Sequence, residues 1–260
     1  MSDKVSDRIS ESMSRLLGAD YGLESVDGDG GGAKQQRDRL NHRLASLEMR
    51  RQANIESVLT MAYAVAGTDE IDGPAPDVED DWLTRFVGHA QEVGNPVMQT
   101  VWGQVLAQET GSPNGFSLRT LDVLADMTAE DWGTWKRAGR LCFPTGYLLK
   151  LGTRNEFDEF EVTRSDIERL QTLGMVQETD DLSVTFYAPT KGLTFDFVGA
   201  NLVVRHPAST LFTLPAYRVT GAALEIFRQL GADSADGDYL EALGESLRAS
   251  SYDFRLRETD

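Results

Sequence analysis

The stretch Gly111-Ser-Pro-Asn-Gly-Phe-Ser-Leu-Arg-Thr-Leu121 separates two apolar helical patterns, and its central part falls one residue short of the hydrolase motif G-x-S-x-G. In that motif a strand leads into the turn and a glycine stands on each side of the serine. Here a helical pattern precedes Ser117, and Arg119 occupies the place of the second glycine. Phe116 and Leu121 have the spacing of a hydrophobic staple around a helix N-cap. We therefore interpret Ser117 as a helix cap and not as a nucleophile.

The same arrangement recurs at three threonines, each of which lies between two apolar residues with the staple spacing. These threonines are Thr128, Thr163 and Thr220. Asn95-Pro96 adds a cap followed by a proline at the first helical position, which predicts a tight corner between two helices. The repetition favours a structural role for all of these residues.

Two charges beside the opening stretch lie where the helix dipole disfavours them. Glu109 is at the end of the preceding helical pattern, and Arg119 is at the second position of the next one. Opposite charges on both sides of one elbow are well placed to neutralise each other. We predict a Glu109–Arg119 ion pair that fixes the angle between the two helices.

Residues 33–66 form one long helical pattern whose apolar residues recur at near-heptad spacing. Its members are Leu40, Leu44, Leu47, Val58, Met61 and Val65. Arg51 and Asn54 interrupt this seam and argue against a long uninterrupted coiled coil. The seam predicts packing either on the same chain's helical domain or on a second copy, so we expect self-association or a protein partner.

The first half of this helix carries a local excess of arginines within an acidic chain. They are Arg37, Arg39, Arg43, Arg50 and Arg51. We interpret them as a candidate interaction face that is either solvated or in contact with an acidic surface of the same fold, ahead of a nucleic-acid contact.

Residues 1–32 combine an amphipathic segment with a glycine-rich linker. Val5, Ile9 and Met13 share one helical stripe, and the mixed charge of the polar face favours docking on protein over adsorption to a membrane. The run Asp27-Gly-Asp-Gly-Gly-Gly32 resembles the start of a calcium loop, but Asp38 stands where a bidentate glutamate is needed. A flexible linker is the better interpretation.

The pattern changes from helical to mixed near residue 148. A short helix over 163–174 precedes alternating segments at 182–186 and 193–197, an order that resembles a winged helix. Charges of both signs on that helix favour a packing or protein-contact role over DNA reading. A third strand over 200–204, two helices over 220–230 and 236–247, and a last strand over 252–256 complete this part.

The predicted fold is therefore mainly α with a smaller α+β C-terminal part: a helical bundle followed by a winged-helix-like helix and β-hairpin. We expect an N-terminal segment over 1–32, a helical domain over 33–147 and an α+β domain over 148–260.

Composition limits the class of protein. The formal net charge of −17 repels a phosphate backbone from most of the surface, unless a local basic patch overrides it, so nucleic acid is not the expected partner. The single cysteine, Cys142, excludes an intramolecular disulfide, and the first residues lack the features of a signal peptide. No apolar run approaches the ~20 residues of a membrane span. A soluble, cytoplasmic protein is expected.

Familiar catalytic motifs are missing from the sequence. It contains no H-E-x-x-H, paired C-x-x-C, P-loop or Rossmann fingerprint, so we expect no cofactor and no bound metal. Glu156, Asp158, Glu159 and Glu161 form the densest acidic cluster, which we interpret as a solvated face.

Four segments carry a resemblance to a known family: Asp80-Asp-Trp-Leu-Thr-Arg-Phe86, Asn95-Pro-Val-Met-Gln99, Trp102-Gly-Gln-Val-Leu-Ala-Gln-Glu109 and Ser112–Leu121. Over about residues 45–145 the chain resembles a bacterial family classed as a domain of unknown function and, more loosely, is similar to the abortive infection alpha proteins. The resemblance implies a helical fold and a setting in phage defence. It assigns no catalytic residue.

These observations favour a non-enzymatic protein-interaction or regulatory protein. Two alternatives stay open: a metal-dependent hydrolase or nuclease that uses acidic residues, and nucleic-acid binding through the basic long helix.

Overall fold

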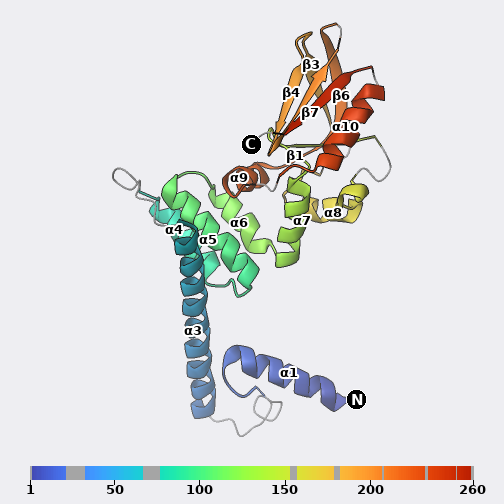
Figure 1. Ribbon diagram of the computed structural model, residues 1–260. Coiled ribbons are helices and arrows are strands. Elements are labelled where there is room, and N and C mark those ends of the chain that lie inside the picture. The colour runs from blue at the N-terminus through green and yellow to red at the C-terminus, as the bar shows by residue number, and fades with distance from the viewer. Residues whose placement is uncertain are drawn as a thin grey trace.

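The structure is a computed structural model that describes residues 2–21, 33–66, 77–152, 157–178, 182–206, 208–231, 234–249 and 251–258. Figure 1 shows a projecting pair of helices, a helical body and a lobe of β-strands. The chain is mainly helical with a small antiparallel sheet part toward its C-terminus, which confirms the coarse fold class. The predicted glycine-rich linker lies outside the described residues, as does Glu156 of the acidic cluster.

Two helices project from the rest of the molecule. Helix α3 (Ala33–Ala66) confirms the long helix predicted over the same residues. Helix α1 (Ser2–Leu17) contacts α3, and Figure 1 shows it beside the first half of that helix. We call α1 together with residues 33–50 of α3 the arm.

The body consists of short helices, which are α4 (Asp80–Ala90), α5 (Pro96–Gly111), α6 (Leu118–Asp126) and α7 (Ala129–Gly139). Of these, α5, α6 and α7 begin at the predicted caps. Asn95 accepts hydrogen bonds from the backbone N–H groups of Val97 and Met98. Thr128 forms a reciprocal capping box with Asp131. The corner predicted at Asn95-Pro96 is confirmed.

The lobe contains two small antiparallel sheets. One has the strand order β1-β2-β6-β3, and the other has the order β4-β5-β7. The strands are β1 (Cys142–Phe143), β2 (Tyr147–Leu149), β3 (Ser183–Ala188), β4 (Leu193–Phe197), β5 (Ala200–Arg205), β6 (Thr210–Arg218) and β7 (Asp253–Glu258). The helical elements beside them are η1 (Asp158–Phe160), α8 (Arg164–Thr172), α9 (Gly221–Gln229) and α10 (Gly237–Ala249).

The predicted winged-helix-like hairpin is wrong. Strands β3 and β4 follow α8 in the expected order, but β3 pairs with β6 and β4 pairs with β5. Alternation along a strand identifies its buried face but not its neighbour, and the neighbours here come from later in the chain.

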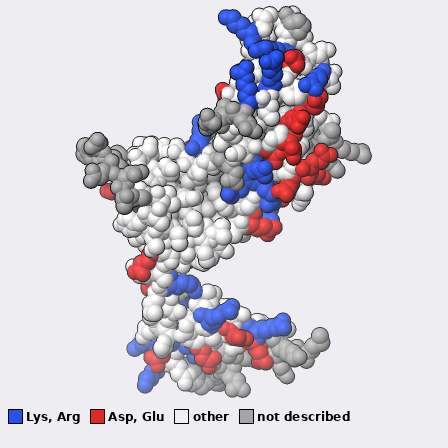
Figure 2. Space-filling view, viewed as in Figure 1, with Lys and Arg blue, Asp and Glu red and all other residues white. Residues whose placement is uncertain are grey.

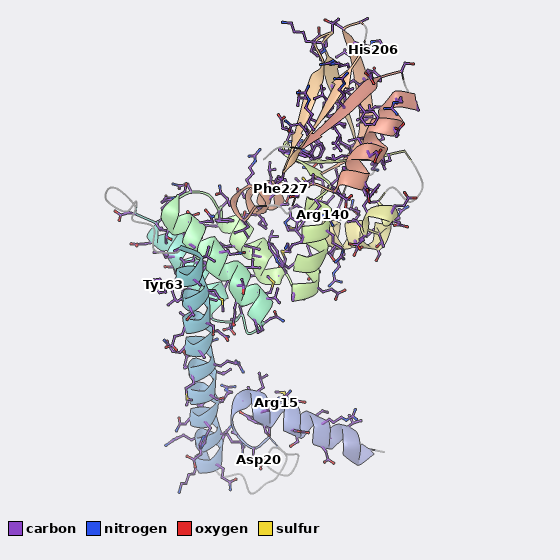
Figure 3. The ribbon with its side chains drawn as sticks, in the orientation of Figure 1. Arg15, Asp20, Tyr63, Arg140, His206 and Phe227 are labelled. Atoms are coloured by element: carbon purple, nitrogen blue, oxygen red, sulfur yellow. The ribbon has the colours of Figure 1, made fainter. Side chains whose placement is uncertain are left out.

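One contiguous apolar core extends from the body into the lobe. It includes Trp102 and Leu121 in the body and Leu148 and Leu202 in the lobe, all of them fully buried. Helix α9 packs on α6, and Arg140 forms an ion pair with Asp236 close to this junction. Figure 3 labels Arg140 and Phe227 there. Across the described ranges, the structure contains no helix with the length and apolar character needed to cross a bilayer.

Candidate interaction surface on the arm

The two halves of α3 have different surroundings although they share one apolar stripe. In the second half Asn54, Val58 and Ala62 are buried against the body, mainly against α5. The helices approach closely because α5 carries Gly103 at their crossing, where an added Cβ would lie 2.5 Å from the Cβ of Met61. The stripe predicted to be a seam is therefore closed within the chain over this half.

Asn54 forms a polar junction inside that packed half. Its side-chain amide donates to the carbonyl of Gln91 at 2.8 Å and accepts from Gln99 at 3.3 Å. Gln99 donates in addition to the carbonyl of Val93. The residue that interrupts the seam thus satisfies polar groups where α3 meets the α4–α5 corner.

Arg51 marks the point at which α3 leaves the body. Its guanidinium contacts Glu48 at 2.8 Å and Glu92 at 2.7 Å. The hydrogen bonds to Glu48 and Glu92 raise the pKa of Arg51, so this side chain stays charged. Arg51 is therefore engaged within the chain and is not part of a free basic face.

The C-terminal end of α1 is attached to α3. Arg50 donates to the carbonyl of Leu16 at 3.2 Å. Gly18, with a φ of 70°, lies against Ser46 so closely that a Cβ on this glycine would come within 2.5 Å of the serine Cβ. Tyr21 then donates its backbone N–H to the hydroxyl of Ser14. These contacts attach the C-terminal end of α1 to α3, whereas most of the apolar residues of α1 are exposed.

Exposed apolar side chains cover the arm. Leu44 is 49% exposed and Val58, on the same stripe of α3, is 1% exposed. On α1 the apolar stripe is uncovered, whereas three serines of that helix are half-buried. The exposed members are Val5, Ile9, Met13, Leu16, Leu40 and Leu44. Isolated exposed apolar residues are ordinary, but several of them in line on neighbouring helices are unusual.

Three of the predicted arginines line a hollow of about 600 Å³ near the free end of α3. Arg37, Arg39 and Arg43 lie there with Tyr21 and Leu40. In the described part of the chain none of these arginines forms an ion pair, and the Nε atom of Arg43 is buried without a hydrogen-bond partner. A buried donor without an acceptor is costly, so an oxygen from a bound molecule would stabilise this site.

The elbow predicted at residues 111–121 is a scaffold. The hydroxyl of Ser117 accepts from the backbone N–H of Thr120, which confirms it as the cap of α6. Glu109 is buried, and its carboxylate accepts from the backbone N–H groups of Asn114 at 2.6 Å and Phe116 at 3.0 Å. Trp82 donates to the carbonyl of Phe116. Glu109 thus organises the turn through backbone groups.

The predicted Glu109–Arg119 ion pair is wrong. Arg119 is exposed, and no ion pair joins it to Glu109. Asn114 has a φ of 69°, so the chain turns back and aims its own N–H groups at the carboxylate. The carboxylate of Glu109 therefore accepts hydrogen bonds from these neutral backbone groups. The local charge pattern had favoured Arg119 as its partner.

Sequence reasoning missed Glu225. This residue of α9 accepts from the backbone N–H of Ser117 at 2.8 Å and from the hydroxyl of Thr120. It is more than 100 residues away along the chain, and no local pattern connects it with the elbow. Glu225 thus binds the start of α6, and Glu109 binds the turn that precedes it.

Two titratable side chains of the described residues, Cys142 and Tyr239, are fully or almost fully buried. In this part of the chain no group of three His, Cys, Asp or Glu side chains is arranged to hold a metal ion. Burial raises the pKa of the Cys142 thiol to about 12, so it is not an activated thiolate. Burial also raises the pKa of Tyr239, whose hydroxyl donates to the carbonyl of Leu149.

Comparison with known proteins identifies a family. The model of the family described as protein of unknown function (DUF2806) matches residues 38–244, well beyond the segment in which the resemblance is visible. No curated protein and no solved structure matches the chain. The matched range covers most of α3, the body and much of the lobe but does not include α1. The chain belongs to this family.

Proposed function

We propose that this protein is a non-enzymatic interaction or regulatory protein and that the arm is its partner-binding element. The partner that we infer is another protein, which presents an apolar helix flanked by carboxylates. One observation carries the proposal: the apolar stripe of α3 is covered over its second half and open over its first.

Continuity of the stripe argues for a helical partner. In the covered half α5 lies in the groove, and Val58 and Ala62 contact it as part of the core. Leu40 and Leu44 continue the same spacing beyond the body. A helix that packs there would extend an interface that the chain already forms with its own α5.

The charges beside the stripe define the chemistry of the partner. Arg37 and Arg39 flank Leu40, and Arg43 carries the buried Nε atom that lacks an acceptor. Carboxylates on the partner would supply that acceptor and pair with the other guanidinium groups. A second arm would instead bring like charges together along α3, which favours a different, acidic protein.

Apolar residues also decide between a protein and a nucleic acid as the ligand of this helix. A phosphate backbone is held by cations and polar groups, and it leaves leucines beside them exposed to water. Arg50 and Arg51 are already engaged with Leu16 and with Glu48 and Glu92. The remaining combination of leucines and arginines fits an acidic helix better than a phosphate backbone.

Site-specific photocrosslinking in the producing cells tests this proposal. A photoreactive residue at Leu44 should form an adduct with another protein, and the crosslinked peptide should be helical and rich in carboxylates. Leu40→Glu together with an Arg37→Glu change should abolish capture. Met49→Glu is the matched control, because Met49 is on α3, is 72% exposed and is not part of the stripe.

Two other crosslinking outcomes would change or overturn the proposal. An adduct between two copies of the chain would replace the acidic partner by self-association. Failure of Leu44 to crosslink above the level of a photoreactive residue at Met49 would overturn the proposal. Light scattering gives an independent readout, because an isolated chain without its partner should have a mass near 28.7 kDa.

The resemblance to abortive infection proteins adds a setting in phage defence to the proposal. If that setting holds, cells that carry the gene with its neighbours should lose protection when Leu40 and Leu44 are both changed to Glu. They should retain protection with Met49→Glu. Equal protection by all of these variants would remove the arm from any such role.

A further inference from the structure

The lobe carries a basic face that is formed by residues distant from one another in the sequence. It consists of Arg205, Arg255 and Arg257 on the outer side of the β4-β5-β7 sheet, together with the exposed Lys191 in the turn that precedes β4. Inward residues of the same strands, such as Phe195 and Leu202, are buried in the core, whereas these cations are exposed. Figure 2 shows Lys and Arg side chains gathered on this lobe. We call these four residues the sheet face.

Strand register brings the sheet face together. Arg255 pairs with Val203, and Arg257 pairs with Asn201, so Arg205 is on the same side of β5 as their partners. Residues two apart on a strand are separated by about 6.6 Å, and neighbouring strands by about 4.8 Å. The arginines therefore form a compact array, although they lie about 50 residues apart in sequence.

The cations of the sheet face have no partners in the described part of the chain. None of the four forms an ion pair or a side-chain hydrogen bond there. Arg51, Arg140 and Arg169 each contact at least one carboxylate. Asp196 and Asp253 share the face, but neither is in an ion pair with any of the described arginines. Unpaired cations gathered on one face of an acidic chain indicate a ligand of opposite charge.

Protection of a sheet edge does not account for this array. Charged residues often occur on edge strands, where they prevent aggregation, and β7 is such an edge. Arg205, however, is on the central strand β5. Its side chain lies over Gly192, where a Cβ would come within 3.1 Å of the arginine Cγ, and Lys191 precedes this glycine. The glycine therefore leaves room for Arg205 beside the turn that carries Lys191.

We propose that the sheet face binds the phosphate backbone of a nucleic-acid duplex without reading its sequence. Protein interfaces are centred on apolar side chains, and the described outer residues of this sheet are polar or charged apart from the buried Val203. No aromatic side chain is on this side of β4, β5 or β7 to stack on unpaired bases. Arginines at strand spacing suit phosphate oxygens, which position a duplex but do not specify its bases.

The sheet face is the local basic patch that nucleic-acid binding by so acidic a chain requires. A chain of charge −17 repels nucleic acid unless a basic patch is locally dominant, and the sheet face is such a patch, at a distance from the arm. It is independent of the proposed partner of the arm. The array of about four phosphate contacts predicts weak binding with a steep dependence on salt.

Fluorescence anisotropy with the full chain tests the proposal. Two labelled 20-base-pair duplexes of unrelated sequence should bind equally at 50 mM salt. Affinity should fall on the order of 100-fold between 50 and 200 mM salt, because about four counterions are released. Arg205→Glu with Arg257→Glu should weaken binding at least about tenfold at 50 mM salt.

A matched variant places the charge change elsewhere. Arg37→Glu with Arg39→Glu alters the net charge equally but on the arm, and it should leave duplex affinity within about twofold if contacts at the sheet face dominate. Equal losses from both double variants, or no binding at 50 mM salt, would overturn the proposal. Circular dichroism melts would verify that every variant is folded.

Two further probes separate other anionic ligands. If poly-glutamate competes as strongly as an unlabelled duplex, the face binds acidic protein and the proposal fails. If phosphatidylserine vesicles bind the chain while the duplex does not, the ligand is a membrane surface and the proposal fails. A strong preference for the duplex over both supports it.

Discussion

The two halves of α3 carry the same apolar pattern, but only one of them is closed by its own chain. Val58 and Ala62 are core residues against α5, whereas Leu40 and Leu44 are exposed to solvent. The difference arises outside α3, because α5 and the rest of the body cover only the second half of this helix. An apolar stripe therefore predicts that something covers it, and the tertiary structure decides whether the cover is part of the same chain.

The largest effect should come from filling the close crossing in the covered half. Gly103→Val would force its side chain into Met61 and Ala62, whose atoms are 2.5–2.9 Å from the position of an added Cβ. We expect a loss of about 3 kcal/mol in the free energy of unfolding, measured with urea. Gly88→Ala is the control, because nothing lies within 4 Å of an added Cβ in that helix, and it should stabilise by up to about 1 kcal/mol. Equal effects of the two changes would contradict the close crossing.

A matched pair on the stripe gives the next largest difference. Val58→Ala should lower the free energy of unfolding by about 2 kcal/mol, because it removes buried methyl groups and leaves a cavity. Leu44→Ala should change the isolated chain by less than about 0.5 kcal/mol, although it removes a larger side chain. Thermal unfolding of both variants measures the contrast. A destabilisation by Leu44→Ala as large as that by Val58→Ala would show that the arm is closed within the chain.

Acid should act on the body through its capping carboxyls. Burial opposes ionisation of Asp131, but hydrogen bonds from Thr128 and Arg169 outweigh it and hold the pKa of Asp131 below its usual value. The stability that this group contributes is present above the pKa of the unfolded chain, about 3.9, and is lost as the pH falls through the lower folded value. All of the tryptophans lie in the body, so their fluorescence reports its unfolding. Asp131→Asn should lower the free energy of unfolding of the body at pH 7 and reduce the difference in that free energy between pH 7 and pH 3. An unchanged difference would exclude Asp131 as a source of the acid sensitivity.

The smallest effect is expected at the boundary between the halves. Arg51→Gln removes the ion pairs with Glu48 and Glu92, whose side chains are largely exposed. Exposed pairs contribute about 0–1 kcal/mol, so the melting temperature should fall by only a few degrees at most. A double-mutant cycle with Glu92→Gln isolates the coupling between the two side chains. A coupling well above 1 kcal/mol would mean that Arg51 is a principal attachment of the arm.

Local sequence predicted the helix starts well because a cap depends on only a few residues. Ser117, Thr128, Thr163 and Thr220 each accept from the backbone N–H three residues later. The donors are fixed by the first turn of the helix itself, so nothing distant is required. Among the candidate site residues, those with structural roles were accordingly the easiest to identify.

Strand pairing and the partners of charged residues were harder to predict. Strand β6 lies between β2 and β3, although Pro215 within it is typical of an edge strand. The five arginines of α3 form one basic group in the sequence, but Arg50 and Arg51 contact other parts of the chain. The sheet face combines residues from separate strands, and no single window of sequence contains it.

The sequence by itself determined the long helix, the capped corners and the acidic character of the chain, because periodicity, capping and charge are properties of residues within a few positions of one another. Only the tertiary structure decided that Glu109 binds backbone N–H groups, that Glu225 reaches the elbow, and that half of the α3 stripe is left open. The contact of Glu225 and the open half of the stripe depend on where segments distant in sequence lie, and the contacts of Glu109 depend on the turn at Asn114. A side chain bonds to the partner that folding brings within reach, and sequence distance does not encode that geometry.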